Sequence, residues 1–102
     1  MNPPSEVKIL GVPIGVVFKE DLIHDGLCQY NDCLIEVKAG QLKIREVDAV
    51  VHELLHMIDY MHNLKLTESQ VHRSATALIA LLADNPKLLE YIKFSIENPK
   101  LK

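Results

Sequence analysis

The pentapeptide His52-Glu53-Leu54-Leu55-His56, which has the form H-E-x-x-H, constrains this chain more than any other feature. It lies in a run whose apolar residues recur with the 3.6-residue period of an α-helix. Positions i and i+4 of a helix share one face, so His52 and His56 can bind one metal ion together. Glu53 points to the side, where it can reach a water molecule on that metal. The pattern therefore predicts a helix that carries a metal site.

The residues around the pentapeptide support this prediction. The apolar residues gather on one side of a helical wheel, and they are Val47, Val50, Val51, Leu54, Ile58 and Met61. The opposite side carries His52, His56, Asp59 and Asn63. The helix, expected from Ile44 or Arg45 to Asn63, would bury one stripe and present both histidines on the other. An amphipathic helix whose polar face carries two histidines by chance is the alternative.

Composition limits the class of protein. A chain of 102 residues has room for one domain, residues 1–102, with one core. A net charge of -3 and an aromatic content of 5% do not favour a nucleic-acid partner. The longest apolar stretch, residues 75–83, is too short to span a membrane, and residues 1–6 lack the pattern of a signal peptide. We therefore expect a cytoplasmic protein.

The two cysteines, Cys28 and Cys33, agree with a reducing compartment. They match the first half of a zinc–thiolate site, but the chain has no second cysteine pair. Two ordinary thiols in a hairpin are the favoured interpretation, and a disulfide across the turn stays open.

The remaining sequence predicts an α+β fold. Short β-branched and apolar runs predict strands at residues 7–10, 14–18, 27–30 and 33–37, the first two being separate or one broken strand. Everything after Gln41 is expected to be helical. Thr67 and Gln70 form a capping-box pattern at the start of a second helix. Asn85-Pro86 ends that helix and starts a third, which Asn98-Pro99 stops.

Three residues compete to be the third metal ligand. His62 copies the spacing of the longer pattern H-E-x-x-H-x-x-G-x-x-H, but Asp59 stands where that pattern has glycine, and a continuing helix would turn His62 away. Glu68 lies in the first turn of the second helix, which the turn at residues 64–66 would fold antiparallel to the first. His72 follows one turn later. Glu68 is favoured, because catalytic zinc is often held by two histidines and a glutamate, although an acid that complements the helix dipole is its plainer interpretation.

The segments 52–56, 66–71 and 83–86, together with 9–11 and 26–37, resemble the small zincin-type metallopeptidases of bacteria and their phages. The chain is similar to minimal gluzincins and to the catalytic half of ImmA/IrrE-type peptidases. The resemblance implies a small twisted sheet with an edge hairpin, packed on a metal-binding helix and followed by two C-terminal helices. It implies that His52, His56 and Glu68 are zinc ligands and that Glu53 is the catalytic acid/base. Of the family's frequent E-x-x-A-N-x-F-A pattern, only Glu68 and Ala75 are kept, which leaves the third ligand open.

This resemblance makes the chain a candidate zinc-dependent endopeptidase, a hydrolase with a protein or peptide substrate. The expected substrate position is an added strand along residues 27–37. Tyr60 and Tyr91 are candidate oxyanion donors by residue type, although core or surface packing is the favoured role for both. Asp59 is either a partner for a ligand imidazole or an exposed acid at the end of its helix. In so small a domain the site is expected either to be shallow or to be covered by residues 97–102, which would make the enzyme latent. The alternative is a catalytically silent module for protein binding, with no metal or with a structural zinc closed by His52, His56, His62 and His72. Oligomeric state is not predicted.

Overall fold

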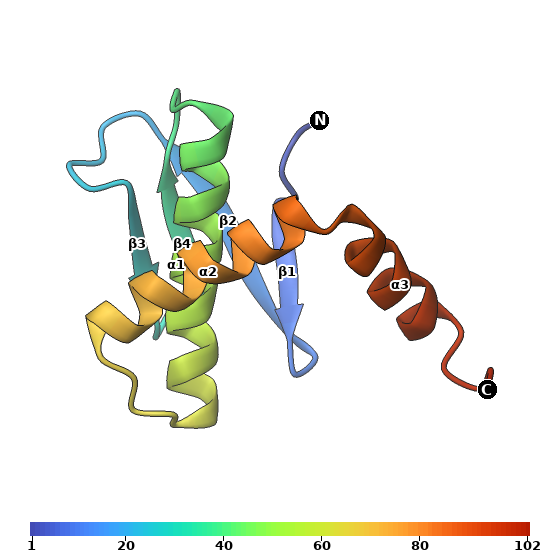
Figure 1. Ribbon diagram of the computed structural model, residues 1–102. Helices are drawn as coiled ribbons and strands as arrows, with labels where there is room; N and C mark the ends of the chain where they lie inside the picture. Colours follow the sequence, from blue (N-terminus) through green and yellow to red (C-terminus); the bar gives the residue numbers. More distant parts are fainter.

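The computed structural model covers residues 1–102 and contains a four-stranded mixed sheet and three helices (Figure 1). The strands are β1 (Glu6–Ile9), β2 (Val12–Lys19), β3 (Gly26–Gln29) and β4 (Leu34–Lys38). Their order in the sheet is β1-β2-β4-β3. The prediction of an α+β fold is confirmed, with strand positions close to the expected ones.

The first two strands form a hairpin and not one broken strand. They pair antiparallel, with Ile9 opposite Val12. The turn between them contains Leu10 and Gly11, both with positive φ (52° and 77°), which reverses the chain within two residues. β2 then pairs in parallel with β4, so the chain reaches the far edge of the sheet through β3 before it returns to the middle.

The expected edge hairpin consists of β3 and β4, and only β3 lies at the edge of the sheet. β4 is paired on both sides, with β2 and with β3, and its residues Ile35, Glu36 and Val37 are buried. The prediction that a substrate could add along all of residues 27–37 is therefore wrong for the β4 half. Only β3 lies at the edge on this side of the sheet, because the parallel pairing with β2 uses the other side of β4.

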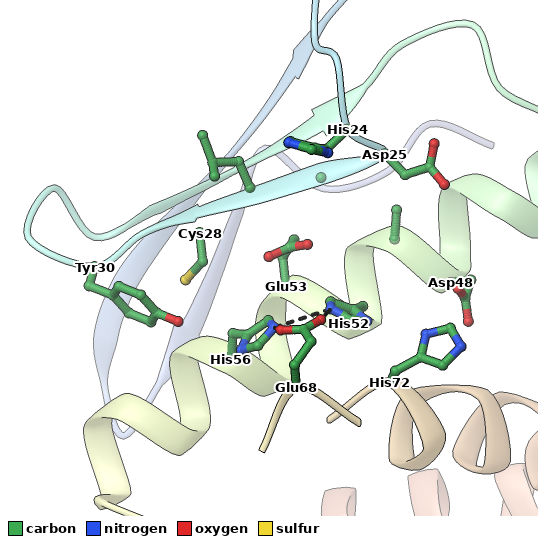
Figure 2. Close-up of a pocket in the computed structure, with 13 residues that line it drawn as sticks. His24, Asp25, Cys28, Tyr30, Asp48, His52, Glu53, His56, Glu68 and His72 are labelled. Carbon is green, nitrogen blue, oxygen red and sulfur yellow. Dashed lines mark hydrogen bonds and ion pairs between the residues drawn. The ribbon is translucent and has the colours of Figure 1, made fainter. Parts of the chain in front are cut away.

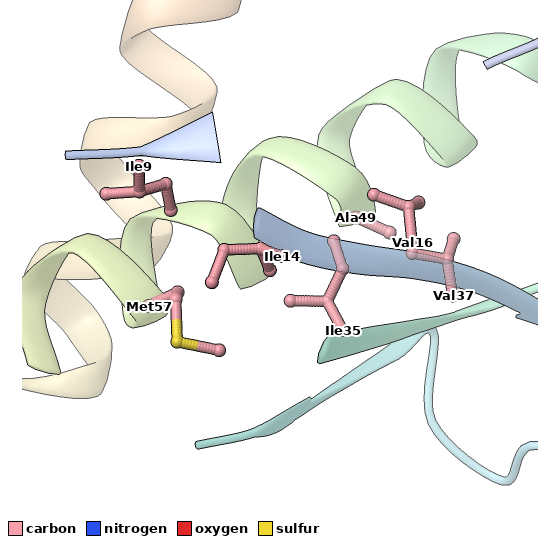
Figure 3. Close-up of a cluster of buried hydrophobic side chains, with 7 residues drawn as sticks. All are labelled: Ile9, Ile14, Val16, Ile35, Val37, Ala49 and Met57. Carbon is pink, nitrogen blue, oxygen red and sulfur yellow. The ribbon is translucent and has the colours of Figure 1, made fainter. Parts of the chain in front are cut away.

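Helix α1 (Lys43–His62) packs across the sheet and closes the core (Figure 3). The core cluster consists of Ile9, Ile14, Val16, Ile35, Val37, Ala49 and Met57. The most buried line of α1 is Ala49, Glu53 and Met57, one turn apart. Val50, Leu54, Ile58 and Met61 of the predicted stripe pack beside this line, whereas Val47 is 41% exposed. Glu53 therefore lies in the buried line of α1, beside the face that carries His52 and His56.

The two C-terminal helices are α2 (Glu68–Asp84) and α3 (Pro86–Glu97). Instead of running back alongside α1 as an antiparallel partner, α2 crosses it, and α3 extends away from the sheet (Figure 1). Val71 and Ala75 are the buried residues of α2, and α3 has none. None of the three helices combines the length and apolar character needed to cross a membrane.

Candidate metal centre

The two histidines of the H-E-x-x-H pattern converge as the helix geometry predicts (Figure 2). Their Nε2 atoms are 3.1 Å apart, and their ring centroids are separated by 4.8 Å. Each side chain is 15% exposed, so the two nitrogens are shielded but not sealed from solvent. The i, i+4 spacing on α1 is sufficient to aim both imidazoles at one point.

Glu68 completes the cluster from the start of α2. Its carboxylate oxygens lie 2.8 Å from Nε2 of His52 and 2.8 Å from Nε2 of His56 (Figure 2). The three side chains offer ligand atoms that all lie within 4.8 Å of one another. Two atoms bound tetrahedrally to one ion at 2.0–2.1 Å would be about 3.3–3.4 Å apart. The observed separations of 2.8–3.1 Å are shorter than this, so the three side chains lie close enough together to hold one ion if they move slightly apart.

Local structure fixes where Glu68 can reach. Asn63 ends α1 in the left-handed region (φ 54°), which turns the chain out of the helix. Thr67 then caps α2 with a complete capping box: Gln70 N–H donates to its hydroxyl at 3.1 Å, and Thr67 N–H donates to the Gln70 side chain at 2.8 Å. The predicted cap is confirmed, and Glu68 follows it directly.

Asp59 holds a turn, a role that neither of its two predicted alternatives included. Its Oδ1 accepts a hydrogen bond from the backbone N–H of Leu66 at 3.0 Å, and its carbonyl accepts one from Leu64 N–H at 3.1 Å. Asp59 therefore holds the turn that carries Glu68, and its only side-chain hydrogen bond is to this turn and not to a ligand imidazole. Through that turn it positions the third member of the cluster.

The other two candidates for the third ligand do not join the cluster. His62 is exposed and lies outside the pocket that contains His52 and His56. His72 lines the same pocket, with its ring centroid 5.9 Å from that of His52, but it does not belong to the group of converging ligand atoms. With three converging candidate ligands and not four, the arrangement matches an open metal site better than a closed structural one.

Glu53 lies between α1 and β3, beside the cluster (Figure 2). The residue is only 7% exposed, and it takes part in none of the chain's ion pairs. Burial raises the pKa of its carboxyl; His52 opposes this shift and the Glu68 carboxylate adds to it. A buried carboxyl with a raised pKa is a stronger base than an exposed one, which suits it to accept a proton in the pocket.

The pocket runs along β3 and is open to solvent. In addition to Glu53 and the cluster of His52, His56 and Glu68, its walls come from the end of the β2–β3 loop, β3, α1 and α2. They include His24, Asp25, Gly26, Leu27, Cys28, Tyr30, Asp48, Ala49 and His72. Residues 97–102 do not line it, and the C-terminus lies on the side of the molecule away from β3 (Figure 1). The expected cover by the C-terminal segment is not observed.

The tyrosine in this pocket is one that residue type alone did not single out. Tyr30 lines the pocket, whereas Tyr60 and Tyr91 do not. The Tyr60 ring packs on Tyr30 with centroids 4.8 Å apart, and Tyr91 is 68% exposed on α3. Burial, followed by the charges of Cys28 and Glu53, raises the pKa of Tyr30, which stays protonated. Side chains alternate along a strand, so Gly26, Cys28 and Tyr30, which directly follows β3, share one side. This alternation is the sequence signal that could have identified Tyr30 as a pocket residue.

The two cysteines remain free and differ in environment. Burial and the nearby Glu53 charge raise the pKa of Cys28 from 9.0 to about 12, an effect that a hydrogen bond with Tyr30 only partly offsets. Cys33 is exposed. At pH 8 a shift of this size lowers the thiolate fraction of Cys28 by about a thousandfold.

We therefore expect iodoacetamide to modify Cys33 and largely to spare Cys28 in the metal-free protein. Mass spectrometry of the Cys28→Ser and Cys33→Ser variants would measure each rate separately. Equal rates in the folded variants would contradict the buried environment of Cys28, and both rates should converge in denaturant.

No protein-family model matches the chain, and neither a curated protein nor a solved structure matches it.

Proposed function

We propose that this chain is a zinc-dependent endopeptidase of the zincin type. The observation that carries the proposal is the convergence of two imidazole nitrogens and one carboxylate at a single point, beside a buried glutamate and along a free strand edge. Each of these features has a role in peptide hydrolysis. If the two histidines lay on the helix by chance, there would be no reason for Glu68, Glu53 and a free strand edge to lie beside them.

The donor set is consistent with zinc. Two histidine nitrogens and one glutamate oxygen are a common ligand set of catalytic zinc, which keeps a further position for water or substrate. His52, His56 and Glu68 would hold the ion. When bound there, zinc would lower the pKa of a water molecule and polarise the carbonyl of the peptide bond to be cut.

Glu53 is the proposed general base and acid. Its carboxylate would take a proton from the attacking water and deliver it to the nitrogen of the leaving amine. Its burial supports this role, because the raised pKa increases its proton affinity. Its position one residue after His52, on the line of α1 that faces β3, keeps it next to the ligands.

The substrate is proposed to be an extended peptide lying along β3. A strand at the edge of a sheet has free backbone donors and acceptors that can pair with another chain. The pocket follows this edge from Gly26 to Tyr30 and includes His52, His56 and Glu68. It is open, which suits a segment within a longer polypeptide and so favours an endopeptidase.

Tyr30 is the proposed donor to the oxyanion that forms on the peptide carbonyl. Its protonated hydroxyl can donate a hydrogen bond, and removal of one such donor typically lowers kcat by about 100–1000-fold. We expect Tyr30→Phe to lower kcat by about 100-fold with zinc content and KM nearly unchanged.

The matched control is Tyr60→Phe, which removes a hydroxyl from the stacked partner ring outside the pocket. It should retain activity within a few-fold. Equal losses in both variants would indicate disturbed packing of the two rings and not a lost donor.

The experiment that tests the proposed function uses tag-free protein loaded with one equivalent of zinc and a library of quenched fluorescent peptides. Cleavage that stops with a chelator and returns with added zinc would support the proposal. Zinc bound at one per chain without cleavage of peptides or of an unfolded protein would favour the alternative, a silent binding module. Absence of zinc binding would contradict the metal centre itself.

A further inference from the structure

Gly26, the first residue of β3, lies directly against the side chain of Glu53. A Cβ atom built on Gly26 would be 2.8 Å from Cγ of Glu53, 2.8 Å from its Oε2 and 3.2 Å from its Cδ. Contacts shorter than 3.0 Å are essentially not seen for real Cβ atoms. The Glu53 side chain therefore occupies the space that any other residue at position 26 would need.

The reason for glycine at this position is steric and not conformational. Gly11 and Gly40 have positive φ and open space around them, so their role is to shape turns. Gly26 has no positive φ. Gly15, on β2, would bring a Cβ only to an ordinary 3.4 Å from Cβ of Leu34. Among the glycines of the chain, Gly26 alone meets a side chain of the candidate site.

We propose that Gly26 is a positioning residue. Because it has no side chain, the Glu53 carboxylate can lie between α1 and β3, beside the proposed metal ligands. This inference rests on the proposed function. The clash involves the outer part of a side chain and not the backbone of α1, so a methyl group at position 26 would displace the carboxylate and leave the fold in place. Displacing a catalytic group by about 1 Å can lower the rate about 100-fold.

The kinetic test compares Gly26→Ala with Gly15→Ala, the same change on β2, where a methyl group fits. Gly26→Ala is expected to lower kcat for peptide cleavage by about 100-fold, with KM and zinc affinity within a few-fold of wild type. Gly15→Ala should retain kcat within a few-fold. A Gly26→Ala enzyme with wild-type kcat would overturn the positioning role.

A second test reads the contact without activity, by thermal unfolding of metal-free protein. The cycle consists of wild type, Gly26→Ala, Glu53→Ala and the double variant. Gly26→Ala should lower Tm by about 4–8 °C in the wild-type background, and much less where Glu53→Ala has emptied the space. The same shift in both backgrounds would overturn the contact.

The two tests separate the possible failures. If wild type cleaves nothing, the proposed function fails and the positioning role fails with it, while the unfolding cycle still reports whether the two side chains compete for one space. If wild type cleaves and the cycle shows coupling, retained kcat in Gly26→Ala would overturn the positioning role alone.

Discussion

Replacing Glu53 with glutamine is expected to lower kcat for peptide cleavage by about a thousandfold while zinc stays bound. Glutamine keeps the shape of the side chain, so it fits between α1 and β3 as Glu53 does, but it cannot accept a proton from water. General acid–base groups typically contribute about 100–10,000-fold to a rate. His52, His56 and Glu68 are untouched, so the zinc content should remain one per chain.

The same change should raise the Tm of the metal-free protein. Glu53 is a buried carboxyl outside every ion pair, and burial makes its charged form unfavourable in the folded state. Removing that charge stabilises the folded state. Glu46→Gln, in the first turn of the same helix and outside the pocket, is the matched control and should change neither kcat nor zinc content. A Glu53→Gln variant that still cuts at the wild-type rate would contradict the proposed mechanism.

Replacing Glu68 with alanine is expected to weaken zinc binding by about 100-fold or more. Even the loss of a residue that hydrogen-bonds to a zinc ligand lowers zinc affinity by about 10–100-fold, so the loss of one of the three proposed ligands should lower it at least as much. The Glu68 side chain is 70% exposed, so the metal-free fold should keep nearly the same Tm. Competition with a chromophoric chelator measures the affinity, and circular dichroism checks the fold.

Two further variants make this result specific. Glu90→Ala removes an exposed acid on α3, away from the pocket, and should bind zinc as wild type does. His72→Ala removes the nearest rival ligand and should weaken binding by no more than a few-fold. A larger loss of zinc affinity in His72→Ala than in Glu68→Ala would make His72 the third ligand and contradict the role proposed for Glu68.

Local features of the fold follow directly from the sequence. The helix that carries His52 and His56 was predictable, because its apolar period and the i, i+4 spacing depend only on nearby residues. The capping box at Thr67 and the break at Asn85-Pro86 were predictable for the same reason. The predicted bounds of the four strands lie close to the observed ones, because β-branched runs and turn residues determine local structure over a few positions.

The environment of the catalytic candidate depended on tertiary structure. A helical wheel predicts the buried side of α1 only from the apolar residues of that helix. It contains no information on β3, which covers Glu53 and makes it one of the most buried residues of α1. Nor could it identify Gly26 as the residue that leaves room for this side chain. Both depend on a contact between segments 27 positions apart.

By itself, the sequence determined that His52 and His56 share one face of a helix and that Glu53 lies next to them. These features depend only on spacing within one element. The tertiary structure decided that Glu68, and not His62 or His72, meets the histidines. That choice depends on how α1 ends at Asn63, how Asp59 holds the turn and how α2 crosses α1. It also decided that β3 alone forms the edge beside the pocket, since the pairing of β4 with β2 joins strands that are distant in the chain.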